Sequence, residues 1–274
     1  MQSDTLSVIR EWGQARRRHP FFAEGLSEKD IDRIWDDSAE TYGDGTLSKI
    51  HDKIIEFLVS EEYFNRNSDL LDIGCGPGTY SLRFSPIVKN VTAADKSERM
   101  LERLDGICRA ENISNIRTEY MDWNVYIPDK KHDTAFSSLC PPVNSPESIL
   151  KMEKCSRDLC IYISSMSKDR DSIYFDIWRE LGRDYTYQGY DTEYPLRFLE
   201  SIGRDPTLKK FEIKTSDESE PGRLVEFYKR KFLLYRDEQE ISKVIEDVVH
   251  SHAEDGIVRT EQTNRLGLLI WHAS

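Results

Sequence analysis

A glycine-rich segment, followed at a distance by an isolated acid, is the feature of this sequence with the clearest chemical meaning. The segment Gly74–Gly78 comes after the apolar run Leu70–Ile73 and before a helical pattern. Glycine has no Cβ, so the backbone can approach a ligand closely there, and the following helix directs free N–H groups toward that ligand. A second apolar run, Val91–Ala94, ends at Asp95, whose carboxylate can accept hydrogen bonds from a ribose diol. The arrangement is typical of a nucleoside-binding half-sheet.

Two residues beside the glycines distinguish between possible nucleosides. The dinucleotide fingerprint G-x-G-x-x-G requires a third glycine where this chain has Thr79. Asp72 places a carboxylate where a pyrophosphate would lie, which is repulsive, whereas the same carboxylate attracts a sulfonium and an ammonium group. The residues therefore favour S-adenosyl-L-methionine (SAM), which carries both cations.

Four segments resemble, in order, the motifs of the class I SAM-dependent methyltransferases: Leu71–Thr79, Ala94–Leu101, Glu119–Trp123 and Asp133–Ser138. Upstream, Trp35–Tyr42 resembles the W-D-x-x-A-x-x-Y entry segment of many members that act on small molecules. The resemblance is specific over about residues 69–140 and weaker outside them. It implies that SAM is the cofactor, that S-adenosyl-L-homocysteine (SAH) is its product, and that Tyr42 lies over the bound cofactor.

The glycine-turn chemistry and the resemblance together give a set of expected cofactor contacts. Within it, the resemblance implies that Asp122 faces the adenine amine and that Trp123 stacks near the base. The full set is Tyr42, Asp72, Gly74, Cys75, Gly76, Gly78, Thr79, Asp95, Lys96, Met100, Asp122, Trp123 and Ser138.

The methyl acceptor is expected near the segment that follows the fourth strand, because in the family this position faces the methyl group. Here Cys140 precedes Pro141-Pro142 and Val143 follows them, unlike the acid or asparagine and the aromatic residue of nucleic-acid amine methylases. This departure argues against base methylation. The aromatic stretch 174–194 is a second candidate, with pocket, core and dimer surface as open alternatives. The substrate-side candidates are Cys140, Pro141, Asn144, Trp178, Tyr187 and Tyr190.

Composition limits the classes of partner. The 274 residues carry a net charge of −12, which disfavours a general nucleic-acid binder. Arg16–Arg18 is interpreted as a solvated helix end. No run of 18 apolar residues and no signal peptide is present, and the five cysteines show no zinc spacing and no C-x-x-C. We expect a cytoplasmic protein without a metal site or membrane contact; the oligomeric state stays open.

Hydrophobic periodicity predicts the architecture. Helices are expected over residues 1–20, from Ser27 and over 47–58, and strands near 69–73, 91–95, 115–120, 133–138 and 159–164. Strands over 209–215 and 266–272 would close the sheet, with residues 216–262 as a helical insertion between them. The prediction is an α/β fold with a doubly wound, mostly parallel seven-stranded sheet, an antiparallel last strand, an N-terminal helical cap and a helical lid. The expected units are residues 1–60 (cap), 61–170 (SAM-binding core) and 171–274 (lid and closing strands).

The expected function is SAM-dependent methyl transfer to a small molecule by in-line displacement. Such a reaction depends mainly on positioning and on water exclusion. A general base is needed only for a protonated nucleophile, and His51, His132 and His272 qualify only if they reach the crevice. The alternatives are a non-catalytic SAM-binding regulator and a nucleotide-dependent oxidoreductase.

Overall fold

The computed structural model describes residues 2–40, 42, 48–129, 131–166, 172–185 and 192–274. The strands are β1 (Asp69–Ile73), β2 (Asn90–Asp95), β3 (Ile116–Tyr120), β4 (His132–Ser138), β5 (Ser156–Ser165), β6 (Thr207–Ser219), β7 (Ala253–Glu254) and β8 (Ile257–His272). The helices are α1 (Gln2–Arg16), α2 (Pro20–Ala23), α3 (Glu28–Ser38), α4 (Ser48–Ser60), α5 (Ser81–Phe84), α6 (Glu98–Glu111), α7 (Pro146–Glu153), α8 (Ser172–Glu180), α9 (Glu193–Ser201), α10 (Pro221–Phe232) and α11 (Glu238–Ser251).

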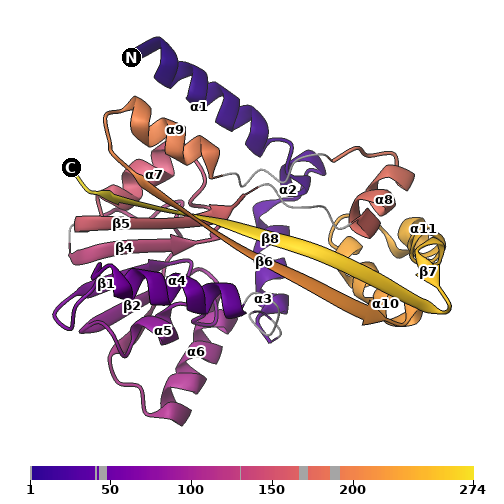
Figure 1. Ribbon diagram of the computed structural model, residues 1–274, viewed down its shortest axis with the longest axis horizontal. Coiled ribbons are helices and arrows are strands. Elements are labelled where there is room, and N and C mark those ends of the chain that lie inside the picture. The colour runs from indigo at the N-terminus through magenta and orange to yellow at the C-terminus, as the bar shows by residue number, and fades with distance from the viewer. Residues whose placement is uncertain (1, 41, 43–47, 130, 167–171, 186–191) are drawn as a thin grey trace.

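One sheet organises the molecule, with the strand order β3-β2-β1-β4-β5-β8-β6 (Figure 1). The first five strands of this order are parallel, and β8 runs antiparallel to both β5 and β6. The two-residue β7 pairs with the start of β8. The predicted fold class is therefore confirmed, including the antiparallel last strand of the seven-stranded path.

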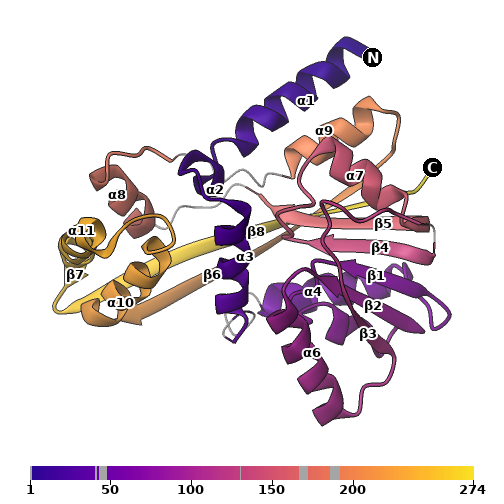
Figure 2. The same cartoon turned by 180° about the vertical axis from the view of Figure 1, so that it is seen from behind.

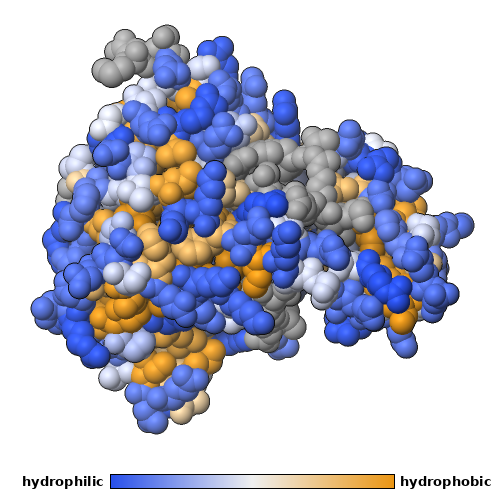
Figure 3. Space-filling model, viewed as in Figure 1, coloured by the Kyte–Doolittle hydropathy of each residue, from blue (hydrophilic) through white to orange (hydrophobic). Residues whose placement is uncertain are grey.

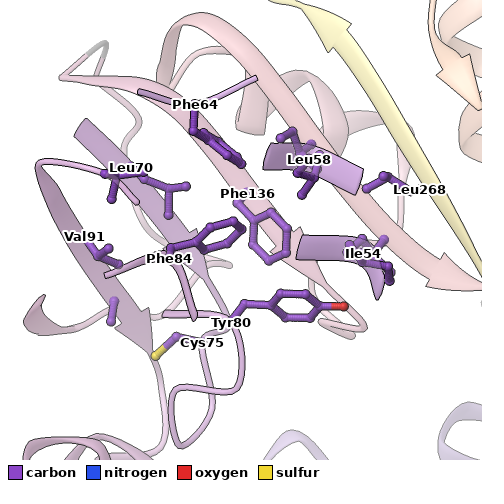
Figure 4. Close-up of a cluster of buried hydrophobic side chains, with 14 of the residues drawn as sticks. Ile54, Leu58, Phe64, Leu70, Cys75, Tyr80, Phe84, Val91, Phe136 and Leu268 are labelled. Atoms are coloured by element: carbon purple, nitrogen blue, oxygen red, sulfur yellow. The ribbon is translucent and has the colours of Figure 1, made fainter. Parts of the chain in front are cut away.

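Apolar residues on both faces of the sheet explain why helices cover both sides. Leu70, Ile161 and Leu268 face one core, which includes residues of α4, α5 and α6. Leu71 and Tyr162 face the second core, which α1, α7 and α9 help to form. Strands that are buried on both faces read as continuous apolar runs. The positions of β1 to β5 were predicted to within three residues. Figure 4 shows part of the first core, where the Phe136 ring lies between β-sheet and helix side chains.

The helix α4 was expected to be part of an N-terminal cap, but it packs on the sheet instead. Its residues Ile50, Ile54 and Leu58 are completely buried in the first core, and the helix contacts α5 and the strand β6. It is thus part of the layer on the sheet. The helix α3, by contrast, lies between the sheet and the distant helices α10 and α11 in both views (Figures 1 and 2). The division of the chain into three units remains a prediction.

The last two long strands carry the helical insertion away from the sheet. The strands β6 and β8 pair from Thr207↔Ile270 to Ser219↔Val258, and α10 and α11 connect them. The insertion is shorter than the predicted 216–262, because residues 257–262 belong to β8 and residues 216–219 extend β6. Their polar side chains resembled a turn, but a strand at the edge of a sheet can be polar. In the space-filling view the insertion and α8, which share one hydrophobic cluster, form a lobe beside the body of the molecule (Figure 3).

The lobe has a core of its own. Trp178 is completely buried among aromatic rings, with centroids 4.8 Å from both Tyr185 and Phe232. The described part of the aromatic stretch 174–194 therefore contributes to a hydrophobic core rather than to an open surface. No helix in the described part of the chain is long and apolar enough to cross a membrane.

Candidate SAM and acceptor site

A cavity of about 790 Å³ lies at the carboxyl ends of the parallel strands. Its wall includes the segments after β1, β2, β3 and β4, together with α3 and residues near the junction of α1 and α2. Parallel strands end on one side of a sheet, which is why these distant segments meet. Of the expected cofactor contacts, the cavity is lined by Tyr42, Asp72, Gly74, Cys75, Gly76, Thr79, Asp95, Lys96, Met100, Asp122, Trp123 and Ser138.

The three glycines of the turn have positive φ angles, but they serve different purposes. A Cβ on Gly74 would lie 2.3 Å from the Cys140 Sγ, and a Cβ on Gly78 would lie 2.4 Å from Leu104 Cδ1. These two positions are glycine because the chain packs tightly there, and Gly78 does not line the cavity. A Cβ on Gly76 would meet nothing nearer than the Tyr42 ring at 3.8 Å. Of the three glycines, only Gly76 both lines the cavity and has open space where a Cβ would lie.

Asp95 joins the glycine turn to the start of α6. Its Oδ2 accepts a hydrogen bond from the Gly76 N–H (2.8 Å), and its Oδ1 accepts one from the Ser97 N–H (2.9 Å). Burial raises the pKa of this carboxyl, and the two amide donors act in the opposite direction. The Ser97 hydroxyl in turn donates to Asp36 of α3 (2.5 Å), so the cap over the cavity is fixed to the same turn.

Asp72 is a buried acid in the cavity wall. Its Oδ2 accepts a hydrogen bond from the Ser81 hydroxyl (2.6 Å), and its side chain lies on the same sheet face as the first core. Burial raises its pKa to about 7, opposed by the Ser81 hydrogen bond. The carboxyl has no cationic partner among the described residues. It is therefore poised to gain its charge when a cation enters the cavity.

The segment after β3 brings an acid and an aromatic ring to the cavity. Asp122 accepts a hydrogen bond from the Asn124 N–H and forms an ion pair with Lys96 (3.2 Å), which also pairs with Asp32 of α3 (2.8 Å). The hydrogen bond with Asp32 raises the pKa of Lys96. Trp123 is buried, and its Nε1 has no hydrogen-bond partner in the described part of the chain. An orphaned donor on a cavity wall is available to a ligand.

The substrate-side candidates fall into three groups. Cys140 and Pro141 line the cavity, and burial raises the pKa of the Cys140 thiol to about 12. Asn144 and Trp178 do not line it, so the structure does not bring these two candidates to the cavity. Asn144 accepts a hydrogen bond from the Trp12 Nε1 (2.9 Å) and holds α1, whereas Trp178 packs in the core of the lobe. Tyr187 and Tyr190 lie outside the described residues.

Of the three histidines considered as bases, only His51 lines the cavity. His132 lies at the far end of β4 with its Nε2 3.1 Å from the Thr92 hydroxyl, and His272 pairs with Asp158 on the exposed end of β8. Arg16 lines the cavity too, so the interpretation as a merely solvated helix end is incomplete.

Other residues of the wall escaped the sequence analysis. They include Tyr80, which directly follows the glycine motif, and Gln262 and Asn264, which come from β8. The position of Tyr80 next to the motif was a usable signal. The two carboxamides carry no local signal, because only the pairing of β8 with β5 and β6 brings them to the cavity. Among the described residues no group of three or more His, Cys, Asp or Glu side chains could hold a metal ion.

Comparisons with known proteins agree with this geometry. Residues 70–157 match the family model described as a methyltransferase domain. The fold is similar to that of the YcgJ protein from Bacillus subtilis, with a TM-score of 0.55, 13% identity and coverage of 80% of this chain and 97% of that one. A SAM-dependent methyltransferase from Aquifex aeolicus has a TM-score of 0.53 at 13% identity, covering 87% and 98%.

A third solved structure is similar over most of this chain. The magnesium protoporphyrin IX methyltransferase ChlM from Synechocystis PCC 6803, solved with bound SAH, has a TM-score of 0.50 at 13% identity, covering 91% and 96%. The structural likenesses support the fold, and the matched family model covers the segments that form the glycine turn and the walls beside it. On these grounds residues 70–157 match a methyltransferase domain, and the chain has a Rossmann-like fold similar to that of solved methyltransferases.

Proposed function

We propose that this enzyme transfers the methyl group of SAM to a small-molecule acceptor that shares one cavity with the cofactor. The observation that carries the proposal is the burial of Asp72 beside the open backbone at Gly76. A carboxylate at this point favours a cationic ligand and disfavours the diphosphate of a nicotinamide dinucleotide. The oxidoreductase alternative is thereby weakened.

The chemical groups that line the cavity match the parts of SAM. Gly76 leaves room for close backbone approach, Asp95 offers a carboxylate for ribose hydroxyls, and Trp123 has an unsatisfied donor beside the acid Asp122. Tyr42 lies against Gly76, where its ring would cover the cofactor, and burial raises the pKa of its phenol. We assign these residues, with Asp72, to cofactor binding.

SAM supplies a methyl group on a positively charged sulfur, which is already an excellent leaving group. The protein contributes by orienting the acceptor and by excluding water. The turn Leu139–Pro142 after β4 lines the cavity, and we assign it to the wall that faces the acceptor. Cys140 has a raised pKa and packs on Gly74, which fits a neutral filler rather than a nucleophile.

A small acceptor follows from the size and charge of the site. A cavity of about 790 Å³ is within the range of roughly 300–1,000 Å³ that is typical of small-molecule sites. The net charge of −12 disfavours nucleic acid as the acceptor. All five cysteines are free thiols, which supports a reducing compartment such as the cytoplasm.

The test combines binding with turnover. Calorimetry should show binding of SAM and SAH and none of NADH. SAM with a deuterated methyl group, incubated with the protein and a metabolite extract, should then label a small compound that mass spectrometry can identify. The variant Asp95→Ala, in which SAM binding should be weakened, serves as the control and should label far less product at the same SAM concentration. Binding of SAM without any labelled product in extracts or macromolecules would favour the non-catalytic regulator instead.

A further inference from the structure

The lining of the cavity includes four uncharged polar side chains that the cofactor assignments do not use. They come from three separate elements: His51 of α4, Tyr80 just before α5, and Gln262 and Asn264 of β8. Within the described part of the chain, none of these side chains has a hydrogen-bond partner. Buried polar groups in folded proteins are almost always hydrogen-bonded. Of the four, the Tyr80 Oη is the one whose polar atom is fully buried without a partner among the described residues, and Gln262 is only half-buried. The orphaned Tyr80 hydroxyl, with three further polar side chains on the lining of the same cavity, indicates a ligand.

Tyr80 is the most informative of the four. Its side chain is only 4% exposed, and its Oη is buried without a hydrogen-bond partner among the described residues. The ring packs on Phe136, with centroids 4.8 Å apart, and Figure 4 shows it at the margin of the apolar cluster. The Ser138 hydroxyl is near enough to oppose the rise in the pKa of Tyr80 that burial causes, but the two groups do not meet hydrogen-bond geometry.

His51 stands next to Tyr80 and is neutral. The two rings have centroids 5.0 Å apart, and His51 is 8% exposed. Burial lowers its pKa to about 4, with Arg83 acting in the same direction and Asp52 against it. Arg83 is fully engaged, because its guanidinium donates to Asp52, the Ser48 hydroxyl and the Thr79 carbonyl oxygen. Of the residues of α4 and α5, only His51 lines the cavity, so these two helices place no cation there.

The other two polar side chains of this group come from β8. Gln262 and Asn264 are separated by one residue and so lie on the same side of the strand, and Asn264 is 7% exposed. Each carboxamide offers both donors and an acceptor but no charge. Burying an ion against such groups is costly, because nothing in them neutralises its charge.

We propose that His51, Tyr80, Gln262 and Asn264 form the acceptor-binding subsite, and that it selects an acceptor with an uncharged hydroxyl group. A hydroxyl can donate to the neutral imidazole or a carboxamide oxygen while it accepts from the Tyr80 phenol. Carboxylate acceptors would find no cation among these four groups, because the cationic residues Arg16 and Lys96 reach the cavity from α1 and from the segment after β2, and they would face the Asp72 carboxyl across the same cavity. This inference rests on the proposed methyl-transfer function.

The test uses phenol, benzoate and benzylammonium as probes of equal ring size. Calorimetry first establishes saturation of the wild-type protein with SAH, and ligand-observed NMR then measures binding of each probe to the SAH complex. We expect phenol to bind at least about tenfold more tightly than either charged probe. In Tyr80→Phe, phenol binding should weaken about three- to tenfold, the range for one neutral hydrogen bond. Gln262→Leu should weaken it similarly, while SAH affinity stays within about twofold.

A second readout separates a binding role from a structural one. The Tyr80 hydroxyl satisfies nothing in the fold, so Tyr80→Phe should keep or raise the melting temperature. Tyr120→Phe is the matched control, because Tyr120 also lines the cavity but is 56% exposed at the end of β3. It should leave phenol binding unchanged.

Three results would overturn the subsite: phenol binding no tighter than a charged probe, including no phenol binding at all; unchanged phenol affinity in Tyr80→Phe; or a lowered melting temperature of that variant. Failure of SAH itself to bind would instead remove the proposed function and the subsite together. The two kinds of failure are thus distinguishable.

Discussion

The backbone N–H of Gly76 donates to the Asp95 Oδ2 across 2.8 Å and so connects the ends of β1 and β2. The residue at the most open point of the glycine turn and the acid expected to bind ribose are therefore one unit. The second carboxylate oxygen accepts from the Ser97 N–H at the start of α6. Asp95 has two tasks as a result, since it shapes the turn and presents its remaining lone pairs to the cavity.

Replacement of this acid should affect the cofactor more than the fold. We expect Asp95→Ala to weaken SAM binding by at least about two orders of magnitude, because two charge-assisted hydrogen bonds of roughly 1.5–3 kcal/mol each are lost. Isothermal titration calorimetry measures the change. Asp247→Asn on the exposed face of α11 is the control and should bind SAM normally. Unchanged SAM affinity in Asp95→Ala would refute the ribose assignment.

The glycines should separate into two classes. Gly78→Ala should destabilise the fold by about 2–4 kcal/mol, because its φ is +92° and the new Cβ would collide with Leu104. Gly76→Ala should cost only about 1 kcal/mol, the usual penalty for a left-handed alanine, because space is open there.

For SAM affinity we expect the opposite ranking of the two positions, with the larger loss at Gly76. The Gly76→Ala methyl group would project at the cavity and should reduce SAM affinity at least about tenfold, and Gly76→Val should abolish binding. Chemical denaturation and calorimetry on the same samples give both quantities. Normal SAM binding by Gly76→Val would mean that the turn does not touch the ligand.

The sequence predicted the central part of the fold because its signals are local. Most of the strands β1 to β5 contain apolar runs, although β3 reads Ile-Arg-Thr-Glu-Tyr, and the two helices of the insertion show clear periodicity. The long ends of β6 and β8 were missed because their residues are polar and pair only with each other. Pairing over such distances leaves no trace in local composition.

The site was predictable where motif spacing determines it, as for Asp72 and Asp95, and not where tertiary partners decide. Asn144 resembled a pocket residue, but its carboxamide oxygen is occupied by the Trp12 Nε1. Trp178 resembled a stacking platform, but α10 and α11 bury it. Gln262 reaches the cavity only because β8 is inserted between β5 and β6.

The pH dependence of SAM binding should report on Asp72. Its carboxyl has a pKa of about 7, raised by burial above the ordinary value of 3.8, so the free protein holds a proton there below pH 7. A bound cation favours the carboxylate and lowers this pKa, so binding releases a proton. SAM affinity should therefore rise as the pH increases from about 5 to about 7.

Calorimetry in buffers of different ionisation enthalpy measures the released proton directly. Asp72→Asn should remove the proton release and flatten the dependence on pH. Asp122→Asn is the matched control, because Asp122 also lines the cavity but is paired with Lys96. Proton release that persists in Asp72→Asn would contradict the assignment of Asp72 as the group that responds to the cation.

The raised pKa of Asp72 also predicts the stability of the free protein. The folded chain binds this proton more tightly than the unfolded chain, so Asp72 lowers stability progressively as the pH rises from about 4 to about 7. Above pH 7 the penalty is complete. Asp72→Asn, without ligand, should thus be more stable than the wild type at pH 8 and nearly equal at pH 4, as measured by urea denaturation.

Glu24 connects the cavity wall to the helical lobe, and its loss should weaken that connection. Its side chain is 1% exposed at the end of α2 and accepts hydrogen bonds from Arg183 (2.9 Å), Tyr185 and Arg236. Burial raises its pKa, but the three donors outweigh that effect and lower it overall. Because both arginines are partly exposed, we expect Glu24→Gln to cost about 2 kcal/mol, below the range for fully buried pairs.

The contribution of Glu24 to the free energy of unfolding should depend on pH. A carboxyl with a lowered pKa stabilises the fold above its ordinary value of 4.5, and this contribution disappears as the pH falls through the folded value. The unfolding free energies of wild type and Glu24→Gln should therefore differ at pH 7 and converge in acid. Glu218→Gln, which breaks the exposed pair with Arg259, is the control and should change stability by less than about 0.5 kcal/mol. Equal stability of Glu24→Gln and wild type at pH 7 would show that the lobe is held to α2 by apolar contacts such as Phe21 on Tyr235 instead.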